Sequence, residues 1–335
     1  MNENRIKAII EKYIKKRVIP GATYLVGNER EVEIYGYKGN MQIIPYERKL
    51  KRELLYDIAS LTKIVITLPL TIKLIQDRKI SLFDPISRFF PHTPDEKRDI
   101  TIFHLLTHTS GYYSYLHELN GITEENVIDK ILSQPLQKRP GKEVIYSCIN
   151  YVTLFYIIKK VESERPETLA NKWFYRPLGM NSTVYTPLKK GIKKKEIVPT
   201  IVTGERGMLQ GNVHDPLSAH LNGVSGNAGL FSTAMDLYKF ATMFLNSGYG
   251  IISEELIQKM EKDYTKNLGN SRGLGWQILG KLIGHTGYTG TSLYFSRKEK
   301  RVAILLTNRV HPKDLYKEEI QTLRKEFHEE VFKET

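Results

Sequence analysis

The chain has 335 residues, of which 41% are hydrophobic, and its 50 Lys and Arg against 37 Asp and Glu give a formal net charge of +13. A folded chain of this length buries roughly three quarters of its extended surface, so a disulfide-dependent mini-protein and a disordered chain are excluded. The longest uncharged apolar stretch, residues 64–72, is far shorter than the about 20 residues of a membrane span, so we expect no membrane partner.

The basic excess does not point to nucleic acid. The densest run of lysines, within residues 189–195, has no interleaved aromatic residue and lies in no recognisable nucleic-acid-binding module. We interpret the run as a solvated loop. The single cysteine, Cys148, excludes an internal disulfide, and residues 1–18 carry charges at every turn, unlike a signal peptide. We therefore expect a cytoplasmic protein with no nucleic-acid partner.

The first elements are a helix and a hairpin. Residues 3–16 carry apolar side chains at helical spacing, with Ile6, Ile9, Tyr13 and Ile14 on one face. Two short β runs follow, at residues 22–26 and 31–37, around a Gly-Asn turn typical of a hairpin.

From residue 60 to about residue 246 the pattern is mostly helical. Apolar stripes at residues 64–75, 127–132, 152–161 and 237–245 predict helices, separated by loops rich in Pro and Gly. Thr233 with Asp236 three residues on resembles a capping box that opens the last helix. Pro69 should kink the first of these helices about one turn past Lys63.

The β pattern returns near the C-terminus, at residues 276–279, 292–296 and 302–307, and an amphipathic helix follows over residues 316–331. The predicted fold class is α+β: an antiparallel sheet from the N- and C-terminal strands, flanked by helices, with an inserted all-helical domain. We expect residues 1–59 and 247–335 to form the sheet domain and residues 60–246 the helical one. An active-site cleft would lie between them.

The sequence Ser60-Leu61-Thr62-Lys63 combines a serine at a helix start with a lysine on the same helix face. A lysine amine that is desolvated in a cleft loses pKa and can accept the serine proton, which activates the nucleophile. The alternative is an N-cap serine with a surface lysine. Ser60 is the only serine with a lysine at this offset, and the apolar helix that follows favours burial.

Two further segments carry polar or small residues at places suited to a cleft. Tyr146 lies where the turn at residues 140–143 leads into a helix, and residues 284–290 (Gly-His-Thr-Gly-Tyr-Thr-Gly) suit a strand edge that a substrate could approach closely. The alternatives are a packed aromatic side chain and a tight turn.

In this order the three segments resemble the serine β-lactamase and penicillin-binding-protein-like family, specifically its class C β-lactamase-like, esterase branch. Its hallmark is S-x-x-K, then Y-x-N, then K-T-G or H-T-G. Further ordered matches cover nearly the whole chain, at residues 20–22, 104–111, 177–180, 226–234 and 285–290.

The resemblance implies a β-lactamase/transpeptidase-like fold and a covalent acyl-enzyme on Ser60, with Lys63 and Tyr146 sharing the role of base. The backbone N–H groups of Ser60 and Tyr288 would form the oxyanion hole. No metal or organic cofactor is implied. The resemblance also gives the expected substrate contacts, which are Tyr112, Cys148, His285, Thr286 and Gly287.

Two departures from the family pattern bear on the substrate. Cys148 replaces the asparagine of Y-x-N, and His285, mostly neutral at pH 7, replaces a lysine. Both changes favour uncharged carboxylic esters as the small-molecule substrate. The alternatives are a D-amino-acid-directed peptidase or amidase, a weak β-lactamase, and a non-catalytic member that binds a ligand. The natural substrate and the oligomeric state stay open.

Two other motifs are interpreted as coincidental. Residues 269–273 fit G-x-S-x-G but lie in a polar loop without the strand and helix that a nucleophile elbow needs. His104 and His108 are four residues apart, yet the glutamate of H-E-x-x-H is missing and no third ligand is evident.

Overall fold

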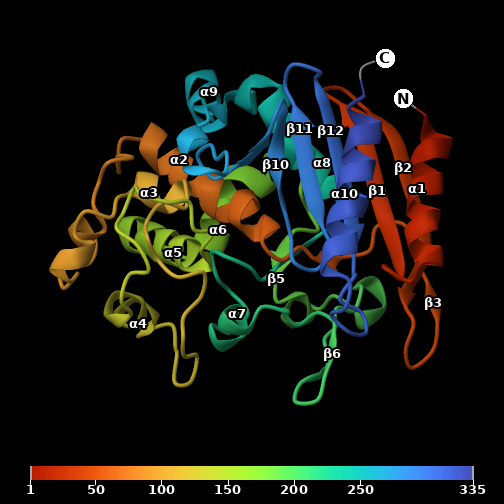
Figure 1. Ribbon diagram of the computed structural model, residues 1–335, viewed down its shortest axis with the longest axis horizontal. Coiled ribbons are helices and arrows are strands. Elements are labelled where there is room, and N and C mark those ends of the chain that lie inside the picture. The colour runs from red at the N-terminus through yellow and green to blue at the C-terminus, as the bar shows by residue number, and fades with distance from the viewer. Residues whose placement is uncertain (1, 334–335) are drawn as a thin grey trace.

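The centre of the protein is a seven-stranded antiparallel sheet in the order β3-β2-β1-β12-β11-β10-β9. In the computed structural model (Figure 1), which describes residues 2–333, strands from both ends of the sequence lie side by side in this sheet. Its strands are β1 (Gly21–Asn28), β2 (Val32–Gln42), β3 (Arg48–Lys49), β9 (Gln277–Leu279), β10 (Leu282–Thr286), β11 (Ser292–Ser296) and β12 (Arg301–Thr307).

Both faces of the sheet are buried, and the alternation of side chains along its central strands divides the core in two. In β1, Leu25 lies opposite Ile304 of β12, and both point into the larger core shared with the middle of the chain. The next pair, Val26 and Ala303, points to the other face and into a smaller core. Because successive side chains of a strand point to opposite faces, this one register fills two separate cores.

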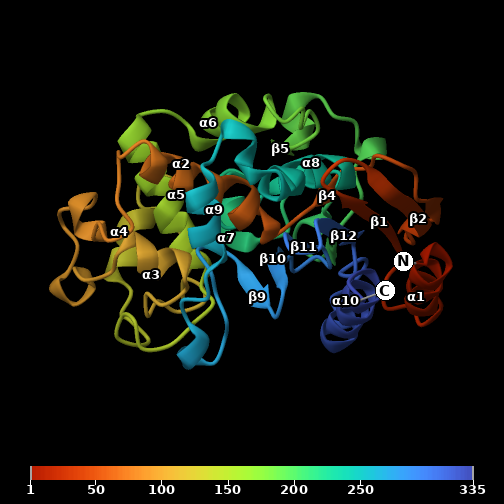
Figure 2. The same cartoon turned by 90° about the horizontal axis from the view of Figure 1, so that it is seen from above.

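The smaller core is covered by the two terminal helices, α1 (Glu3–Lys15) and α10 (Lys317–Val331). They pack side by side on one face of the sheet (Figure 2). Glu326 of α10 accepts hydrogen bonds from Lys12 Nζ at 2.7 Å and from the Tyr13 hydroxyl at 3.0 Å, which links the first helix to the last.

Helices from the middle of the chain cover the other face and extend beyond it (Figure 1). They are α2 (Leu68–Gln76), α3 (Ile102–Leu106), α4 (Val127–Ser133), α5 (Cys148–Glu162), α6 (Pro166–Ala170), α7 (Pro216–His220), α8 (Ala234–Leu245) and α9 (Glu254–Glu261). None of the described helices combines the length and apolar character that crossing a membrane requires.

The expected α+β class, with a sheet from both ends of the chain and helices around it, is confirmed. The hairpin, both terminal helices and the four central helices also form near the predicted positions. The middle of the chain is less purely helical than expected, because it contributes two strands to a small sheet. In this sheet β8 (Leu230–Ser232) pairs with β4 (Tyr56–Asp57) on one side and with β5 (Val184–Tyr185) on the other. A further short pair, β6 (Val202–Thr203) and β7 (Gly207–Met208), was also not predicted.

The division of the chain at residues 59 and 246 stays a prediction. Helix α8 is the element for which it matters, because it lies in the segment assigned to the helical domain but packs on β1 and β12. At its start the Thr233 hydroxyl accepts from the Asp236 N–H, as a cap should. The Asp236 carboxylate instead accepts from the Ser182 N–H and the Thr183 hydroxyl, so the reciprocal half of the capping box is absent there.

The helix after Ser60 departs from α geometry where Pro69 predicts a kink. A buried π-helical segment, Lys63–Thr67, precedes α2, and the Leu68 N–H donates to the Lys63 carbonyl five residues back. Proline lacks the N–H that would bond to the Val65 carbonyl in a regular α-helix. The Tyr175 hydroxyl donates to that carbonyl at 3.3 Å, so the freed acceptor is satisfied by a side chain.

A buried histidine on α10 should make the stability of the fold depend on pH. His328 is buried, 2.9 Å from the Ser292 hydroxyl, and burial with the nearby Arg324 lowers its pKa to about 3. As the pH falls, His328 therefore binds a proton in the unfolded chain before it does so in the folded protein. The contribution of His328 to the unfolding free energy is present above about pH 6.5 and is lost as the pH falls toward about 3. We expect His328→Phe to reduce the loss of unfolding free energy between about pH 7 and about pH 4.5 by about 2 to 3 kcal/mol.

Urea unfolding at the two pH values measures this difference. The exposed His220 provides the control, because His220→Phe should leave the pH dependence of the wild type in place. Equal pH dependence in wild type and His328→Phe would contradict the assignment.

Candidate active site

Ser60 lies at a sharp turn between β4 and the π-helical segment. The preceding residue, Ala59, has φ +46°, in the left-handed region that residues with a side chain rarely adopt. The turn is held by Asp57, whose buried carboxylate accepts from the Ala59 N–H at 2.9 Å and from the His214 N–H at 2.7 Å. The backbone around Ser60 is therefore fixed before any substrate arrives.

Lys63 lies one turn further along, fully buried, with its ammonium group surrounded by three acceptors. Its Nζ is 3.0 Å from Ser60 Oγ, 3.0 Å from the Asn227 carbonyl oxygen and 3.4 Å from Cys148 Sγ. Burial lowers the pKa of Lys63, but the nearby Cys148 and Tyr146 together outweigh this effect, and the pKa is raised. The fall expected from burial alone is thus not found, because two acidic side chains face the amine.

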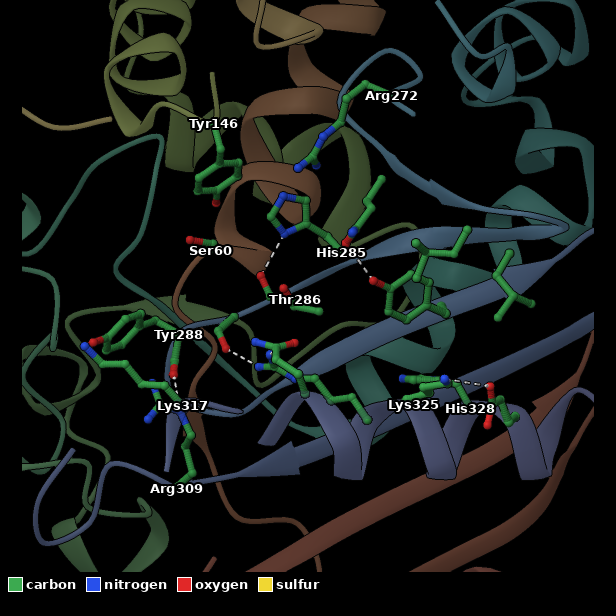
Figure 3. Close-up of a pocket in the computed structure, with 18 of the residues that line it drawn as sticks. Ser60, Tyr146, Arg272, His285, Thr286, Tyr288, Arg309, Lys317, Lys325 and His328 are labelled. Atoms are coloured by element: carbon green, nitrogen blue, oxygen red, sulfur yellow. Dashed lines mark hydrogen bonds and ion pairs between the residues drawn. The ribbon is translucent and has the colours of Figure 1, made fainter. Parts of the chain in front are cut away.

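Tyr146 completes the group from the loop that leads into α5. Its hydroxyl points toward Ser60 (Figure 3), and Lys63 Nζ is 5.1 Å from the centre of its ring. The ring lies between two histidines, with ring centres 4.6 Å from His108 and 5.7 Å from His285. The structure thus brings together the three side chains that the sequence assigned to catalysis.

The segment from His108 to Gly111 positions the start of α5. Nδ1 of His108 accepts from the Ser147 N–H at 3.1 Å, and the His108 carbonyl accepts from the Ile145 N–H at 2.9 Å. Burial, with Arg272 and Lys63 nearby, holds the pKa of His108 well below its usual value, so the ring is neutral. His108 therefore supports the segment that carries Tyr146, and residues 2–333 contain no group of three or more His, Cys, Asp or Glu side chains that could hold a metal ion.

The third motif, residues 284–290, covers the end of β10 and the tight turn after it, and this turn is hydrogen-bonded to the backbone before Ser60. The Thr289 hydroxyl donates to the Asp57 carbonyl at 2.8 Å, and the Thr291 hydroxyl donates to the Ile58 carbonyl at 3.2 Å. The N–H groups of Ser60 and Tyr288 donate no hydrogen bond to any residue within 2–333. Two unoccupied backbone donors of this kind are what an oxyanion hole requires.

His285 is neutral, as the sequence predicts. Its Nδ1 is 2.7 Å from the Thr286 carbonyl oxygen, and burial together with Arg272 and Lys63 holds the pKa of His285 well below its usual value. Its ring lies beside Tyr146 and Arg272 in the cavity (Figure 3). It offers a substrate no positive charge.

A cavity of about 820 Å³ opens over these groups. Of the predicted site residues, it is lined by Ser60, Tyr146, His285, Thr286, Gly287 and Tyr288.

Two of the expected substrate contacts lie behind the cavity wall. Cys148 is buried against Lys63, and Tyr112 is packed in the larger core with its hydroxyl unpartnered among residues 2–333. Tyr112 is therefore corrected from a substrate contact to a core residue. Tyr115, three residues on, lines the cavity instead, and interaction with the Cys148 thiol contributes to raising the pKa of its hydroxyl.

Arg272 is a site residue that the sequence interpretation missed. It projects into the cavity from the loop before β9, with its guanidinium carbon 5.5 Å from the centre of the Tyr146 ring. Its Nε is buried without a hydrogen-bond partner, and no carboxylate within residues 2–333 pairs with it. Arg272 therefore brings to the cavity a permanent positive charge that neutral His285 does not supply. The sequence carried no signal for Arg272, because it lies in the polar loop at residues 269–273 and only the fold brings this loop to the cavity.

This fold and the convergence of Ser60, Lys63 and Tyr146 define a hydrolase of the serine β-lactamase type. The chain belongs to the Beta-lactamase family, whose family model matches residues 6–325. It is 28% identical to a putative D-alanyl-D-alanine carboxypeptidase of Escherichia coli (strain K12), over 77% of this chain and 69% of that protein. It is 27% identical to an N-acetylmuramyl-L-alanine amidase of Bacillus subtilis (strain 168), over 87% of this chain and 78% of that protein.

Solved structures with the same fold include an octameric penicillin-binding protein homologue from Pyrococcus abyssi, with a TM-score of 0.76 and 25% identity over 92% of this chain and 74% of that chain. EstCE1, described as a hydrolase with promiscuous acyltransferase activity, superimposes with a TM-score of 0.77 at 21% identity, over 96% of this chain and 97% of its own. The predicted β-lactamase/transpeptidase-like fold is thus confirmed.

Gly287 is the residue at which the third motif touches the backbone before Ser60. A Cβ at this position would lie 2.1 Å from Thr291 Oγ1 and 2.5 Å from the Ile58 carbonyl oxygen. Because the second neighbour is backbone, Gly287→Ala must displace the turn that carries Tyr288. We expect kcat/KM to fall by about 10²-fold, since a misplacement of about 1 Å can cost that much.

Steady-state kinetics on an activated ester measures the fall. Gly204→Ala is the matched control, because a Cβ at Gly204 meets nothing within 4 Å and its backbone has no positive φ. Unchanged kinetics in Gly287→Ala would show that the turn does not set the geometry of the site.

Proposed function

We propose that this protein is a serine hydrolase that cleaves carboxylic esters through a covalent acyl-enzyme on Ser60. The observation that carries the proposal is the 3.0 Å contact between Lys63 Nζ and Ser60 Oγ, beside two unoccupied backbone donors. A hydroxyl is a weak nucleophile unless an adjacent group takes its proton. The intact group of Ser60, Lys63 and Tyr146 argues against a non-catalytic member that only binds a ligand.

In the proposed reaction Ser60 Oγ attacks the carbonyl carbon and its proton passes to the pair formed by Lys63 and Tyr146. The raised pKa of Lys63 favours its ammonium form at rest. The base of the pair is then the phenolate of Tyr146, which points at Ser60, accepts the proton and becomes the phenol. The bond to the leaving alcohol then breaks, and the same proton completes that alcohol. Water then attacks the acyl carbon and gives a proton to the pair. The bond to Ser60 Oγ breaks, the same proton returns to Ser60 Oγ, and the acid is released.

The negative charge that develops on the carbonyl oxygen would lie between the N–H groups of Ser60 and Tyr288. Each preorganised donor of this kind contributes about 3 to 4 kcal/mol to transition-state stabilisation in other hydrolases. No metal or organic cofactor has a role in this scheme. We further propose that the enzyme works in the reducing interior of the cell, where a free Cys148 beside Lys63 stays a thiol.

A second candidate function is favoured by Arg272. A guanidinium without a carboxylate partner, with its Nε buried beside Tyr146, suits a substrate that carries a carboxylate of its own. Such a substrate could be the C-terminal end of a short peptide, and a relative described as a putative D-alanyl-D-alanine carboxypeptidase agrees with this chemistry. The second candidate is therefore a D-amino-acid-directed peptidase or amidase, with the same nucleophile and the same acyl-enzyme.

The nucleophile can be tested with a fluorophosphonate probe. We expect one adduct per chain, on the peptide that contains Ser60, and loss of both labelling and p-nitrophenyl butyrate hydrolysis in Ser60→Ala. Mass spectrometry of the digested protein locates the adduct. Undiminished labelling or turnover in Ser60→Ala would reject Ser60 as the nucleophile.

Arg272 decides between the two substrate classes. Arg272→Gln should raise KM for a p-nitrophenyl ester with a free carboxylate, such as the hydrogen glutarate, by about 10- to 100-fold, because a hydrogen bond to a charged group contributes about 1.5 to 3 kcal/mol. The change for p-nitrophenyl butyrate should be much smaller. Steady-state kinetics on both esters, on a D-alanyl-D-alanine peptide and on nitrocefin separates the two classes. Equal losses on the charged and neutral esters would contradict a carboxylate site at Arg272.

A further inference from the structure

Arg324 is a buried cation that the proposed mechanism leaves unused. It lies on α10, which runs along the side of the cavity opposite Tyr146 (Figure 3), and only 5% of the residue is exposed. Its Nη2 donates to the carbonyl oxygens of Gly287 and Thr291, the second at 2.9 Å, and its Nη1 donates to Gln321 Oε1 at 3.2 Å.

No carboxylate within residues 2–333 forms an ion pair with this guanidinium. Burial lowers the pKa of Arg324 to about 10, so the group is still a cation at neutral pH. The neighbouring Arg309 is also buried, but Asp314 balances its charge. Burying an unbalanced charge is costly, and a neutral amide could also have donated to a carbonyl of the turn. The positive charge itself therefore calls for an explanation.

The explanation lies in the peptide group that Arg324 contacts. The Gly287 carbonyl and the Tyr288 N–H belong to the same peptide, which is trans, so the two bonds point in opposite directions. Arg324 and the Gly290 N–H, at 3.1 Å, both bond to the carbonyl end. The Tyr288 N–H therefore points away from Arg324, and it is one of the two unoccupied donors beside Ser60.

We propose that Arg324 is a positioning residue that polarises the Gly287–Tyr288 peptide and so strengthens the Tyr288 N–H as a donor to the oxyanion. A cation at the carbonyl end draws electron density away from the N–H, as in any chain of linked hydrogen bonds. The two contacts to the turn also fix the direction of the N–H. This inference rests on the proposed acyl-transfer function and adds a residue remote from the reacting atoms.

The effect should appear in kcat and hardly in KM, because the oxyanion charge develops only in the transition state. Removing a whole oxyanion donor costs about 10²- to 10³-fold in kcat in other hydrolases, so weakening one donor should cost less, about 10- to 100-fold. Arg324→Lys, which keeps the cation, should recover part of the loss seen in Arg324→Gln.

The experiment compares wild type, Arg324→Gln, Arg324→Lys and Lys333→Gln. Lys333 is the charge-matched control, because it lies just after α10, is exposed, pairs with Glu330 and does not line the cavity. Each variant is assayed for kcat and KM on p-nitrophenyl butyrate, and thermal unfolding verifies that it is folded. Infrared difference spectra then record the carbonyl stretch of the acyl-enzyme, which falls in frequency as the hydrogen bonds to that oxygen strengthen.

We expect a lower kcat and a higher carbonyl frequency in Arg324→Gln, an intermediate frequency in Arg324→Lys, and wild-type values in Lys333→Gln. A folded Arg324→Gln with the wild-type kcat and frequency would overturn the inference. If Arg324→Gln does not fold, the carbonyl frequency of Arg324→Lys decides, since a purely structural role leaves it at the wild-type value. Wild-type protein that forms no acyl-enzyme would instead reject the proposed function, so the two failures are distinguishable.

Discussion

The buried ammonium group of Lys63 is the constraint on which the rest of the structure depends. A charge withdrawn from water must find partners, and Lys63 finds them on three segments far apart in the sequence, at Ser60, Cys148 and Asn227. Gly226, the residue before Asn227, is closely packed, since a Cβ there would lie 2.1 Å from the Tyr151 carbonyl oxygen. The helix that carries Lys63 is in turn shaped by Pro69, whose missing N–H is compensated by the Tyr175 hydroxyl.

The sheet side of the cavity is built from backbone groups and buried side chains that hold them. Thr289 and Thr291 fasten the turn after β10 to the carbonyls that precede Ser60, while Arg324 holds the same turn from the opposite side. The turn is thus clamped between the helix start and α10. The proposed reaction needs two N–H groups in fixed positions, and both are backbone groups, those of Ser60 and Tyr288, rather than groups of flexible side chains.

Much of this arrangement was predictable, because hydrophobic periodicity and short sequence motifs indicate it. The helical and alternating periodicities predicted the sheet and its terminal helices, and the motifs around Ser60, Tyr146 and His285 lie together as their order implied. Strand β10 was predicted only as a strand edge within residues 284–290, because Gly284 and the turn glycines interrupt its β pattern. Arg272 and Arg324 could not be predicted as site residues, since only the folded chain brings a polar loop and the last helix to the cavity. Periodicity also cannot say which of Tyr112 and Tyr115 faces the core.

The pairing of β1 with β12 has a consequence for how the protein is made. The first strand and its hairpin leave the ribosome with one edge still unpaired, and that edge is closed only by residues 301–307. Helix α1 likewise finds its partner only when Glu326 has been synthesised. Such pairing of the chain ends gives a high contact order, which slows folding. The nascent chain therefore carries Ser60 and Lys63 from early in translation but has no complete active site until its last helix is released.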